Sequence, residues 1–202
     1  MLDSPQHDFL TTELDPDLLL TPFRVQTNWH VITGAACSGK TTLIDLLTNK
    51  GFQTEPESAR QYIEIEMARG QTLDEIFEDV ATEPGIEDMQ LRIEHELRAN
   101  DVVFLVRALP DSLTFRRLAG LNPDEILVKC FHHRYASVFV LERLPFLQNG
   151  ARIEDDVIAG FIDEWLTRDY SALGYSVLRV PVLSPQELLV FVLERLSEQG
   201  HI

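Results

Sequence analysis

The chain has 202 residues, 45% hydrophobic and 25% charged, which suffices for one globular domain with a core of its own. Its formal net charge of −16 argues against nucleic acid or an anionic membrane as a partner, because both repel an acidic surface. The two cysteines, Cys37 and Cys130, are too few for a disulfide framework or a zinc site, and no apolar run approaches the ~18 residues of a membrane span. We therefore expect a cytoplasmic protein with reduced thiols.

The first 27 residues differ in pattern from the rest. Pro5, Pro22 and the Asp15-Pro16 pair interrupt any long periodicity, so residues 1–27 are predicted to form an extended arm with leucines packed on the domain. Residues 28–202, assigned to one domain, alternate between strand-like and helix-like patterns. The expected strands are 29–33, 52–54, 102–106, 138–141 and 175–180, and the expected helices are 40–49, 57–69, 73–81, 86–99, 110–119, 122–133, one after residue 156, and 185–197.

A phosphate-binding signature lies between the first expected strand and the first expected helix. Gly34, Gly39, Lys40 and Thr41 have the spacing G-x-x-x-x-G-K-[ST]. Glycines let successive N–H groups of such a loop point inward, where they bind phosphates together with the positive end of the following helix. Lys40 is expected to reach the β- and γ-phosphates and Thr41 to hold Mg²⁺. The predicted ligands are ATP and Mg²⁺, and the predicted nucleotide-binding residues are Gly34, Ala35, Ala36, Cys37, Ser38, Gly39, Lys40, Thr41 and Thr42.

The order of elements indicates the fold class. Strands alternate with helices, and the continuous apolar run Val102–Val106 is typical of a strand buried on both faces of a parallel sheet. We predict an α/β fold of the P-loop NTPase type, a three-layer sandwich in which a parallel five-stranded sheet has helices on both faces. The ligand site is expected outside the carboxyl ends of the strands.

Short motifs at a consistent spacing resemble a known family. After the loop at residues 34–42 come Glu57-Ser-Ala-Arg60, Arg107-Ala-Leu-Pro-Asp-Ser112, Gly150-Ala-Arg-Ile-Glu-Asp155 and Leu173-Gly-Tyr175. Over residues 29–196 this pattern resembles the AAA-type P-loop ATPases related to the nicotinamide riboside kinase domain of NadR. The resemblance implies a nucleotide-kinase-like fold with a mobile lid and ATP with Mg²⁺ as ligands. It does not specify the phosphoryl acceptor.

The chain departs from the family pattern at two positions. The pattern places an acidic residue at position 106, where its carboxylate holds Mg²⁺ directly or through water, but the chain has Val106. Phosphoryl transfer depends on position and electrostatics, so this loss is expected to reduce catalysis more than nucleotide binding. Asn149 replaces a second residue that is usually acidic, and its amide can still accept a hydrogen bond.

Two candidate residues follow the second expected strand. Glu57 stands where related nucleoside kinases place the carboxylate that deprotonates the acceptor hydroxyl; a first-turn glutamate favoured by the helix dipole is an equally good interpretation. Arg60 lies one turn later on the same face, where it could bind an anionic part of the acceptor or only pair with Glu57.

Three further candidates lie later in the chain. Arg107 leaves an apolar strand beside the phosphate loop, where contact with phosphate is favoured because an unpaired charge would be costly. Asp111 is a candidate for acceptor binding, although a cap at the start of a helix is the stronger interpretation. Arg152 falls in the polar segment 148–156, which this fold uses as a lid, and could swing onto the γ-phosphate. The predicted catalytic residues are Lys40, Glu57, Arg107 and Arg152, and the predicted substrate-binding residues are Glu57, Arg60 and Asp111.

Three hypotheses about function follow. The leading one is an ATP-dependent enzyme that phosphorylates a small nucleoside- or nucleotide-like acceptor of unknown identity. The alternative is a nucleotide-binding switch or pseudo-enzyme that reports ATP occupancy to a partner, motivated by Val106. ATP hydrolysis alone is weaker, because no residue clearly positions a water. Association into a homo-oligomer stays open.

Overall fold

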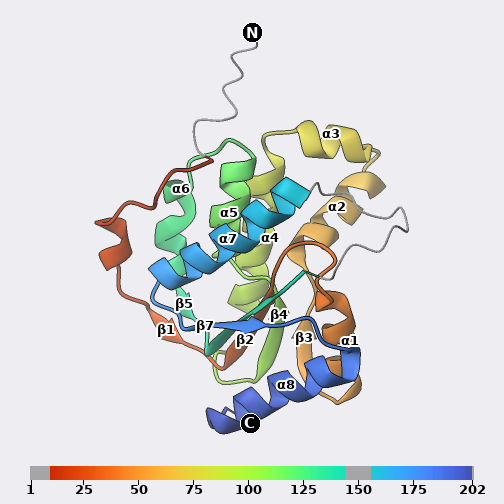
Figure 1. Ribbon diagram of the computed structural model, residues 1–202. Helices are drawn as coiled ribbons and strands as arrows, with labels where there is room; N and C mark the ends of the chain where they lie inside the picture. Colours follow the sequence, from red (N-terminus) through yellow and green to blue (C-terminus); the bar gives the residue numbers. More distant parts are fainter. Residues whose placement is uncertain (1–9, 144–155, 202) are drawn as a thin grey trace.

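A parallel five-stranded sheet forms the centre of the computed structural model, which describes residues 10–143 and 156–201 (Figure 1). Every pair of neighbouring strands is parallel, so all carboxyl ends meet at one edge. The predicted α/β fold with a parallel five-stranded sheet is thus confirmed. The strands lie in the order β3 (Gln53–Glu55), β4 (Val103–Val106), β2 (Trp29–Thr33), β6 (Ser137–Leu141) and β7 (Val177–Val180).

The first strand of this sheet in the chain, β2, is also its central strand. All residues of β2, β4 and β6 are buried, as their apolar runs predict. In the register of the sheet, Ile32 of β2 pairs with Val106 of β4 and Phe139 of β6. The segment after β2 therefore begins where the strand order reverses, which is the usual place for a ligand in an open α/β sheet.

Helices cover both faces of the sheet (Figure 1). On one face, α1 and α8 pack leucine and valine side chains against Ile32 and Phe139. On the other face, α4, α5 and α7 enclose a second core around Val31 and Val138. The bounds are α1 (Lys40–Asn49), α4 (Thr82–Glu96), α5 (Asp111–Leu118), α7 (Asp156–Ala172) and α8 (Pro185–Glu198).

Helix α4 begins earlier than predicted. The helix was predicted from residue 86, but α4 starts at Thr82 and runs through Pro84 and Gly85. Proline is tolerated in a first turn because its missing N–H has no intrahelical partner there. A Cβ at Gly85 would lie 2.4 Å from the ring of Tyr62 on α2 (Ser58–Ala68), so glycine lets α4 pack closely on α2.

The other corrections are smaller. The predicted helix over residues 122–133 is a short helix followed by a 3₁₀ turn, and the last strand starts at Val177 instead of residue 175. Ile65 and Met67, expected to supply apolar contacts, are 41% and 47% exposed. The remaining helices between β3 and β5 are α2 (Ser58–Ala68), α3 (Leu73–Glu78), α6 (Asp124–Leu127) and the 3₁₀ helix η3 (Val128–Phe131).

The described part of the N-terminal arm packs closely on the domain. Leu14 is buried in the core, and the Thr12 carbonyl accepts a hydrogen bond from Arg117 Nε (2.9 Å). Strand β1 (Val25–Gln26) pairs in parallel with β5 (His133–Arg134) in a second, two-stranded sheet. The three leucines form a 3₁₀ turn, η2 (Leu18–Leu20), of which Leu20 remains 80% exposed.

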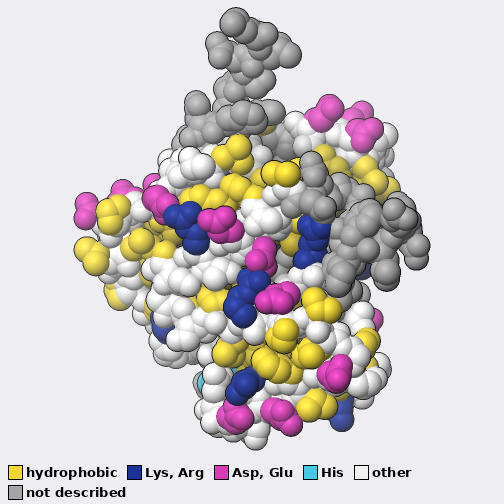
Figure 2. Space-filling model, viewed as in Figure 1, with side chains coloured by type: hydrophobic (Ala, Val, Ile, Leu, Met, Phe, Trp, Pro, Cys, Tyr) yellow, Lys and Arg dark blue, Asp and Glu magenta, His cyan; other side chains and the backbone are white. Residues whose placement is uncertain are grey.

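The surface mixes charges of both signs. On the face in Figure 2, acidic and basic side chains lie beside one another between hydrophobic ones. Two ion pairs of this kind join Arg168 to Glu164 at 3.5 Å and Arg179 to Asp163 at 2.9 Å. Such exposed pairs contribute ~0–1 kcal/mol to stability. Within the described ranges, no helix has both the length and the hydropathy that a membrane span requires.

Candidate active site

The loop between β2 and α1 has a backbone that favours glycine at fixed positions. Gly34, Cys37 and Gly39 have φ angles of +136°, +58° and +91°. A Cβ at Gly34 would lie 2.6 Å from the carbonyl oxygen of Leu141, so a larger residue does not fit there. Left-handed residues inside a tight loop turn successive N–H groups inward and make an anion-binding concavity. The loop therefore has the shape that phosphate binding requires.

Lys40 places its charge inside this loop. The residue begins α1 and is buried, and Nζ donates hydrogen bonds to the carbonyls of Gly34 (2.9 Å) and Ala35 (2.8 Å) and to Ser38 Oγ (3.3 Å). The next residue, Thr41, is exposed and lines the adjoining cavity. The contacts of Lys40 with phosphate and of Thr41 with Mg²⁺ stay predictions.

One cavity of about 1140 Å³ joins the loop to the helices that follow β3 and β4. A pocket for one drug-sized ligand has roughly 300–1,000 Å³, so this cavity is large enough for a ligand the size of a nucleotide. The predicted residues 36–42, Glu57, Arg60, Arg107 and Asp111 all line it. The sequence did not predict its apolar walls, which are formed by Ile63, Phe77, Val80, Ile86, Phe115 and Leu118.

Glu57 and Arg107 form an ion pair in this cavity. Arg107 Nε lies 2.9 Å from Glu57 Oε1, but the N–H is not aligned with an acceptor among the described atoms. The guanidinium also lies over the Phe115 ring, 4.2 Å from its centre. The backbone of Arg107 has φ = +64°, which is uncommon for a residue other than glycine. Its backbone N–H donates a hydrogen bond to the carbonyl of Ile32 (3.0 Å). This sharp turn directs Arg107 out of the sheet toward Glu57, so Glu57 pairs with Arg107 and not with Arg60.

Asp111 connects three elements around the cavity. Its carboxylate, 3% exposed, accepts hydrogen bonds from Thr33 Oγ1, from the Ala108 N–H (3.0 Å) and from the Tyr170 hydroxyl (2.6 Å). Burial raises the pKa of this carboxyl, and the charge of Arg107 opposes the rise. The helix-cap interpretation is wrong, because the N-cap of α5 is Pro110 and Asp111 bonds an N–H ahead of the helix. A role in acceptor binding stays a prediction.

Val106 lies on the face of the sheet toward α1. It is 6% exposed and belongs to the core cluster that includes Ile32, Leu43 and Ile44. Hydrophobic packing therefore occupies the place where the family pattern has a carboxylate. Within residues 10–143 and 156–201, no cluster of three or more histidine, cysteine or acidic side chains could hold a metal ion.

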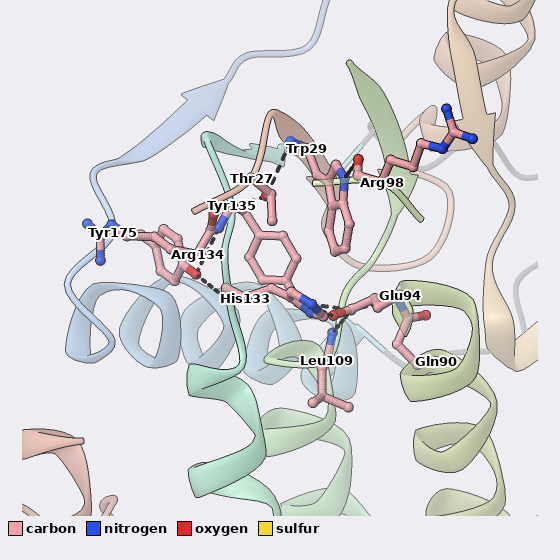
Figure 3. A network of polar contacts seen from close by, with 10 residues as sticks. All are labelled: Thr27, Trp29, Gln90, Glu94, Arg98, Leu109, His133, Arg134, Tyr135 and Tyr175. Atoms are coloured by element: carbon pink, nitrogen blue, oxygen red, sulfur yellow. Dashed lines mark hydrogen bonds and ion pairs between the residues drawn. The ribbon is translucent and has the colours of Figure 1, made fainter. Parts of the chain in front are cut away.

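A buried polar network holds the turn that carries Arg107 (Figure 3). Glu94 of α4 accepts hydrogen bonds from the Leu109 N–H (3.1 Å), the Tyr135 hydroxyl (2.9 Å) and Gln90 Nε2 (2.9 Å), and His133 Nδ1 lies 3.1 Å away. The sequence gives no signal for this network, because its members are distant along the chain. Leu109 lies two residues after Arg107, within the turn that joins β4 to α5. The hydrogen bond to Glu94 therefore helps to hold this turn in place beside the cavity.

Glu83 is a site residue that the sequence analysis missed. It lies in the first turn of α4 and lines the cavity. Burial raises its pKa to about 8, the neighbouring Glu87 adds to the rise, and Arg107 opposes it. The available signal was the proline at position 84, which can stand in the first turn of a helix and would have extended α4 over Glu83.

The remaining predicted residues are only partly placed. Arg60 is exposed at the cavity, and its guanidinium makes no hydrogen bond or ion pair with another described residue. Arg152 and Asn149 lie outside the described residues.

Comparison with known proteins identifies the family. The sequence pattern of a family described as an AAA domain matches residues 29–187. The chain belongs to this AAA domain family. No curated protein matches it significantly. A particular relation to NadR stays a prediction.

Two solved kinase structures share the fold of this AAA domain. Shikimate kinase from Aquifex aeolicus vf5 matches with a TM-score of 0.52 and 16% identity over 85% of this chain and 98% of that chain. Deoxyadenosine kinase from M. mycoides matches with a TM-score of 0.52 and 12% identity over 84% of this chain and 98% of that chain. At such identities the likeness shows a shared fold and not a shared substrate.

The residues present fit a nucleotide better than they fit its metal ion. The inward-turned loop, with Lys40 inside it and a helix N-terminus behind it, suits a triphosphate. For Mg²⁺, Thr41 lines the cavity, but Val106 contributes no oxygen ligand. The metal would therefore depend on Thr41, on phosphate oxygens and on water.

Proposed function

We propose that the AAA domain binds ATP at the loop of residues 34–42 and transfers the γ-phosphoryl group to a hydroxyl of a small molecule. The observation that supports this most is the joint cavity, in which the phosphate loop and the Glu57–Arg107 pair face the same space. A site for nucleotide binding alone would not need the extra apolar walls contributed by α2, α4 and α5.

The positions of the described side chains support a role for each of them. The acceptor oxygen would attack the γ-phosphorus while the bond from that phosphorus to the β–γ bridging oxygen breaks, so that ADP leaves. Lys40 and Arg107 would stabilise the charge on the transferring group, and Glu57 would take the proton of the acceptor hydroxyl. Thr41 would hold Mg²⁺, which neutralises phosphate charge when bound. Arg152 and Arg60 are proposed to contact the γ-phosphate and the acceptor.

The acceptor is proposed to be nucleoside- or nucleotide-like. The cavity walls supply apolar and aromatic surface from Phe77, Phe115 and Ile86, which suits a planar ring, next to the charged pair that a hydroxyl needs. One fold neighbour, the deoxyadenosine kinase, was solved with the products dCMP and dCDP. A comparison of fold alone does not transfer that substrate to this chain.

A turnover assay tests the proposal. Mg²⁺-ATP is incubated with a panel of nucleosides, nucleotides and cyclic hydroxy acids, and ADP formation is measured with wild type and Glu57→Gln. Acceptor-dependent ADP release that Glu57→Gln reduces supports the kinase. ADP release that is independent of every acceptor contradicts phosphoryl transfer and favours hydrolysis.

A second candidate function is a nucleotide-binding switch. Val106 favours it, because a core residue stands where metal-dependent catalysis would use a carboxylate. In that case nucleotide binding would be retained, and no member of the panel would stimulate ADP formation.

A further inference from the structure

Glu83 is a cavity carboxyl for which the proposed reaction has no role. It lies in the first turn of α4, and its neighbour along the cavity wall is Arg107 from the turn after β4. Within the described ranges, no hydrogen bond or ion pair involves the Glu83 side chain. A half-buried carboxyl without such partners is costly to ionise.

The arginines near Glu83 already have acidic partners. Arg107 pairs with Glu57 at 2.9 Å. Arg116 of α5 pairs with Glu87 at 2.6 Å and with Glu125 at 2.7 Å. Each arginine near Glu83 is therefore already paired with another carboxylate, which leaves less positive charge to stabilise ionised Glu83.

All packed elements contribute to the electrostatics of this position. The groups that act on Glu83 most directly are Glu87 on its own helix, Arg107 after β4, and Asp111 and Arg116 on α5. The groups that share its cavity from α2 and its flanks are Glu57, Arg60, Glu64 and Asp79, with Lys40 in the phosphate loop. With a pKa of about 8, raised chiefly by burial, Glu83 is close to half protonated at pH 8.

We propose that nucleotide binding at the phosphate loop is coupled to the uptake of one proton by Glu83, and that Arg107 provides the link. The inference rests on the proposed function, because it requires phosphates in the cavity. These phosphates bring negative charge toward Glu83 and attract Arg107, whose charge favours the ionised carboxylate. Both effects stabilise protonated Glu83. The carboxylate takes its proton from solvent, and no covalent bond other than the new O–H forms.

This coupling makes nucleotide affinity depend on pH. By linkage, a ligand that raises the pKa of a group binds the protonated protein more tightly than the deprotonated protein. Its affinity therefore falls at pH values where the group is ionised in the free protein. Affinity should be highest below pH 7, where Glu83 is already protonated, and should fall as pH rises through 8. The site would then respond to pH through a carboxyl that the chemical step itself does not use.

Calorimetry in two buffers tests the proposal. Mg²⁺ with the non-hydrolysable analogue AMP-PNP is titrated into wild type at pH 8.0, in Tris and in EPPS, because their different ionisation enthalpies report the protons taken up. We expect ~0.2–0.5 proton per bound nucleotide for wild type at pH 8 and a several-fold lower affinity at pH 9 than at pH 7. Equal heats in the two buffers, with affinity constant from pH 7 to 9, would overturn the proposal.

Two variants assign the proton to its residue. Glu83→Gln resembles the neutral acid in shape, so it should keep the affinity measured at pH 7 and lose the buffer-dependent heat. Glu64→Gln, another cavity carboxyl on α2, should keep that heat. An unchanged uptake in Glu83→Gln would show that another group takes the proton. If Glu83→Gln does not fold, the dependence of wild-type nucleotide affinity on pH still decides whether binding is linked to a proton. ¹³C NMR of the glutamate carboxyls of wild type then shows whether Glu83 titrates near pH 8. Absence of any binding heat at every pH would refute the proposed function itself, whereas binding without proton uptake refutes only this coupling.

Discussion

The hydroxyl of Thr33 donates a hydrogen bond to the Asp111 carboxylate and so ties the last residue of β2 to the first residue of α5. Thr33 directly precedes the phosphate loop, and Asp111 closes the turn that carries Arg107. Tyr170 of α7 donates to the same carboxylate. The loop between β2 and α1 and the turn that supplies the cavity arginine are therefore positioned by one buried carboxyl group.

Tyr170→Phe should destabilise the protein by ~1–2 kcal/mol, because the buried Asp111 carboxylate loses a 2.6 Å hydrogen bond. Urea unfolding followed by fluorescence measures the change. Tyr175→Phe is the matched control, since the hydroxyl of Tyr175 makes only longer contacts of 3.3 and 3.4 Å. A loss in the control as large as that in Tyr170→Phe would argue against a special role for the Asp111 bond.

Glu57→Gln should lower acceptor-dependent turnover by ~10²–10⁴-fold if Glu57 is the general base. Its effect on nucleotide affinity should be small, because the carboxylate contacts Arg107 and not the loop. Steady-state turnover and calorimetry with Mg²⁺-ATP give the two numbers. Glu64→Gln, in the same cavity, serves as the control. A change confined to KM would show that Glu57 binds the acceptor without taking its proton.

Val106→Asp should strengthen the Mg²⁺ dependence of nucleotide binding and raise turnover by ~10–100-fold, because it restores an anion at the end of β4. The same change places a carboxylate among Ile32, Leu43 and Ile44, so the free protein should lose stability. Thermal unfolding with and without Mg²⁺-ATP, alongside turnover, separates these effects. If the variant binds nucleotide without any gain in turnover, the nucleotide-switch alternative becomes the better one.

Stability should decrease in mild acid through His30. Burial lowers the pKa of His30 to about 3, and nearby His201 adds to the shift, whereas an unfolded histidine titrates near 6.5. Because the folded pKa is depressed, the stabilisation is fully present above pH 6.5 and is lost as pH falls toward 3, with a limiting slope of ~1.4 kcal/mol per pH unit. Urea unfolding at pH 7, 6 and 5 measures this slope.

His30→Gln is the test variant, because glutamine can still bond Ser137 Oγ, which lies 2.7 Å from His30 Nδ1. His132→Gln is the control at a histidine that is only half-buried. An identical acid slope in wild type and His30→Gln would assign the loss to other groups.

Local patterns predicted the shape of the loop between β2 and α1. The spacing of Gly34, Gly39 and Lys40 reports a backbone requirement, and the structure meets it with left-handed residues and a lysine inside the loop. The strands were predictable for a similar reason, since β2 and β4 are apolar at every buried position apart from His30 and Thr33.

The part of the cavity around Arg107 and Glu57 depends on contacts between residues that are distant along the chain, which a single sequence does not reveal. Arg107 meets Glu57 across fifty positions because of a left-handed turn at a residue other than glycine. Glu83 was missed because the helix was predicted only from residue 86, whereas α4 begins at Thr82 and continues through Gly85, which packs on Tyr62. Tertiary packing overrode local preference at each of these points.

Calorimetric titration of Mg²⁺-ATP into wild type and Lys40→Ala tests the central claim most directly. Lys50→Ala, at the far end of α1, is the control because its charge lies outside the cavity. The account predicts one nucleotide bound per chain by wild type and by Lys50→Ala, and binding weakened by at least ~10-fold, or ~1.4 kcal/mol, in Lys40→Ala, because Lys40 supplies the cation inside the loop. Equal affinity in all three proteins would contradict nucleotide binding at this loop.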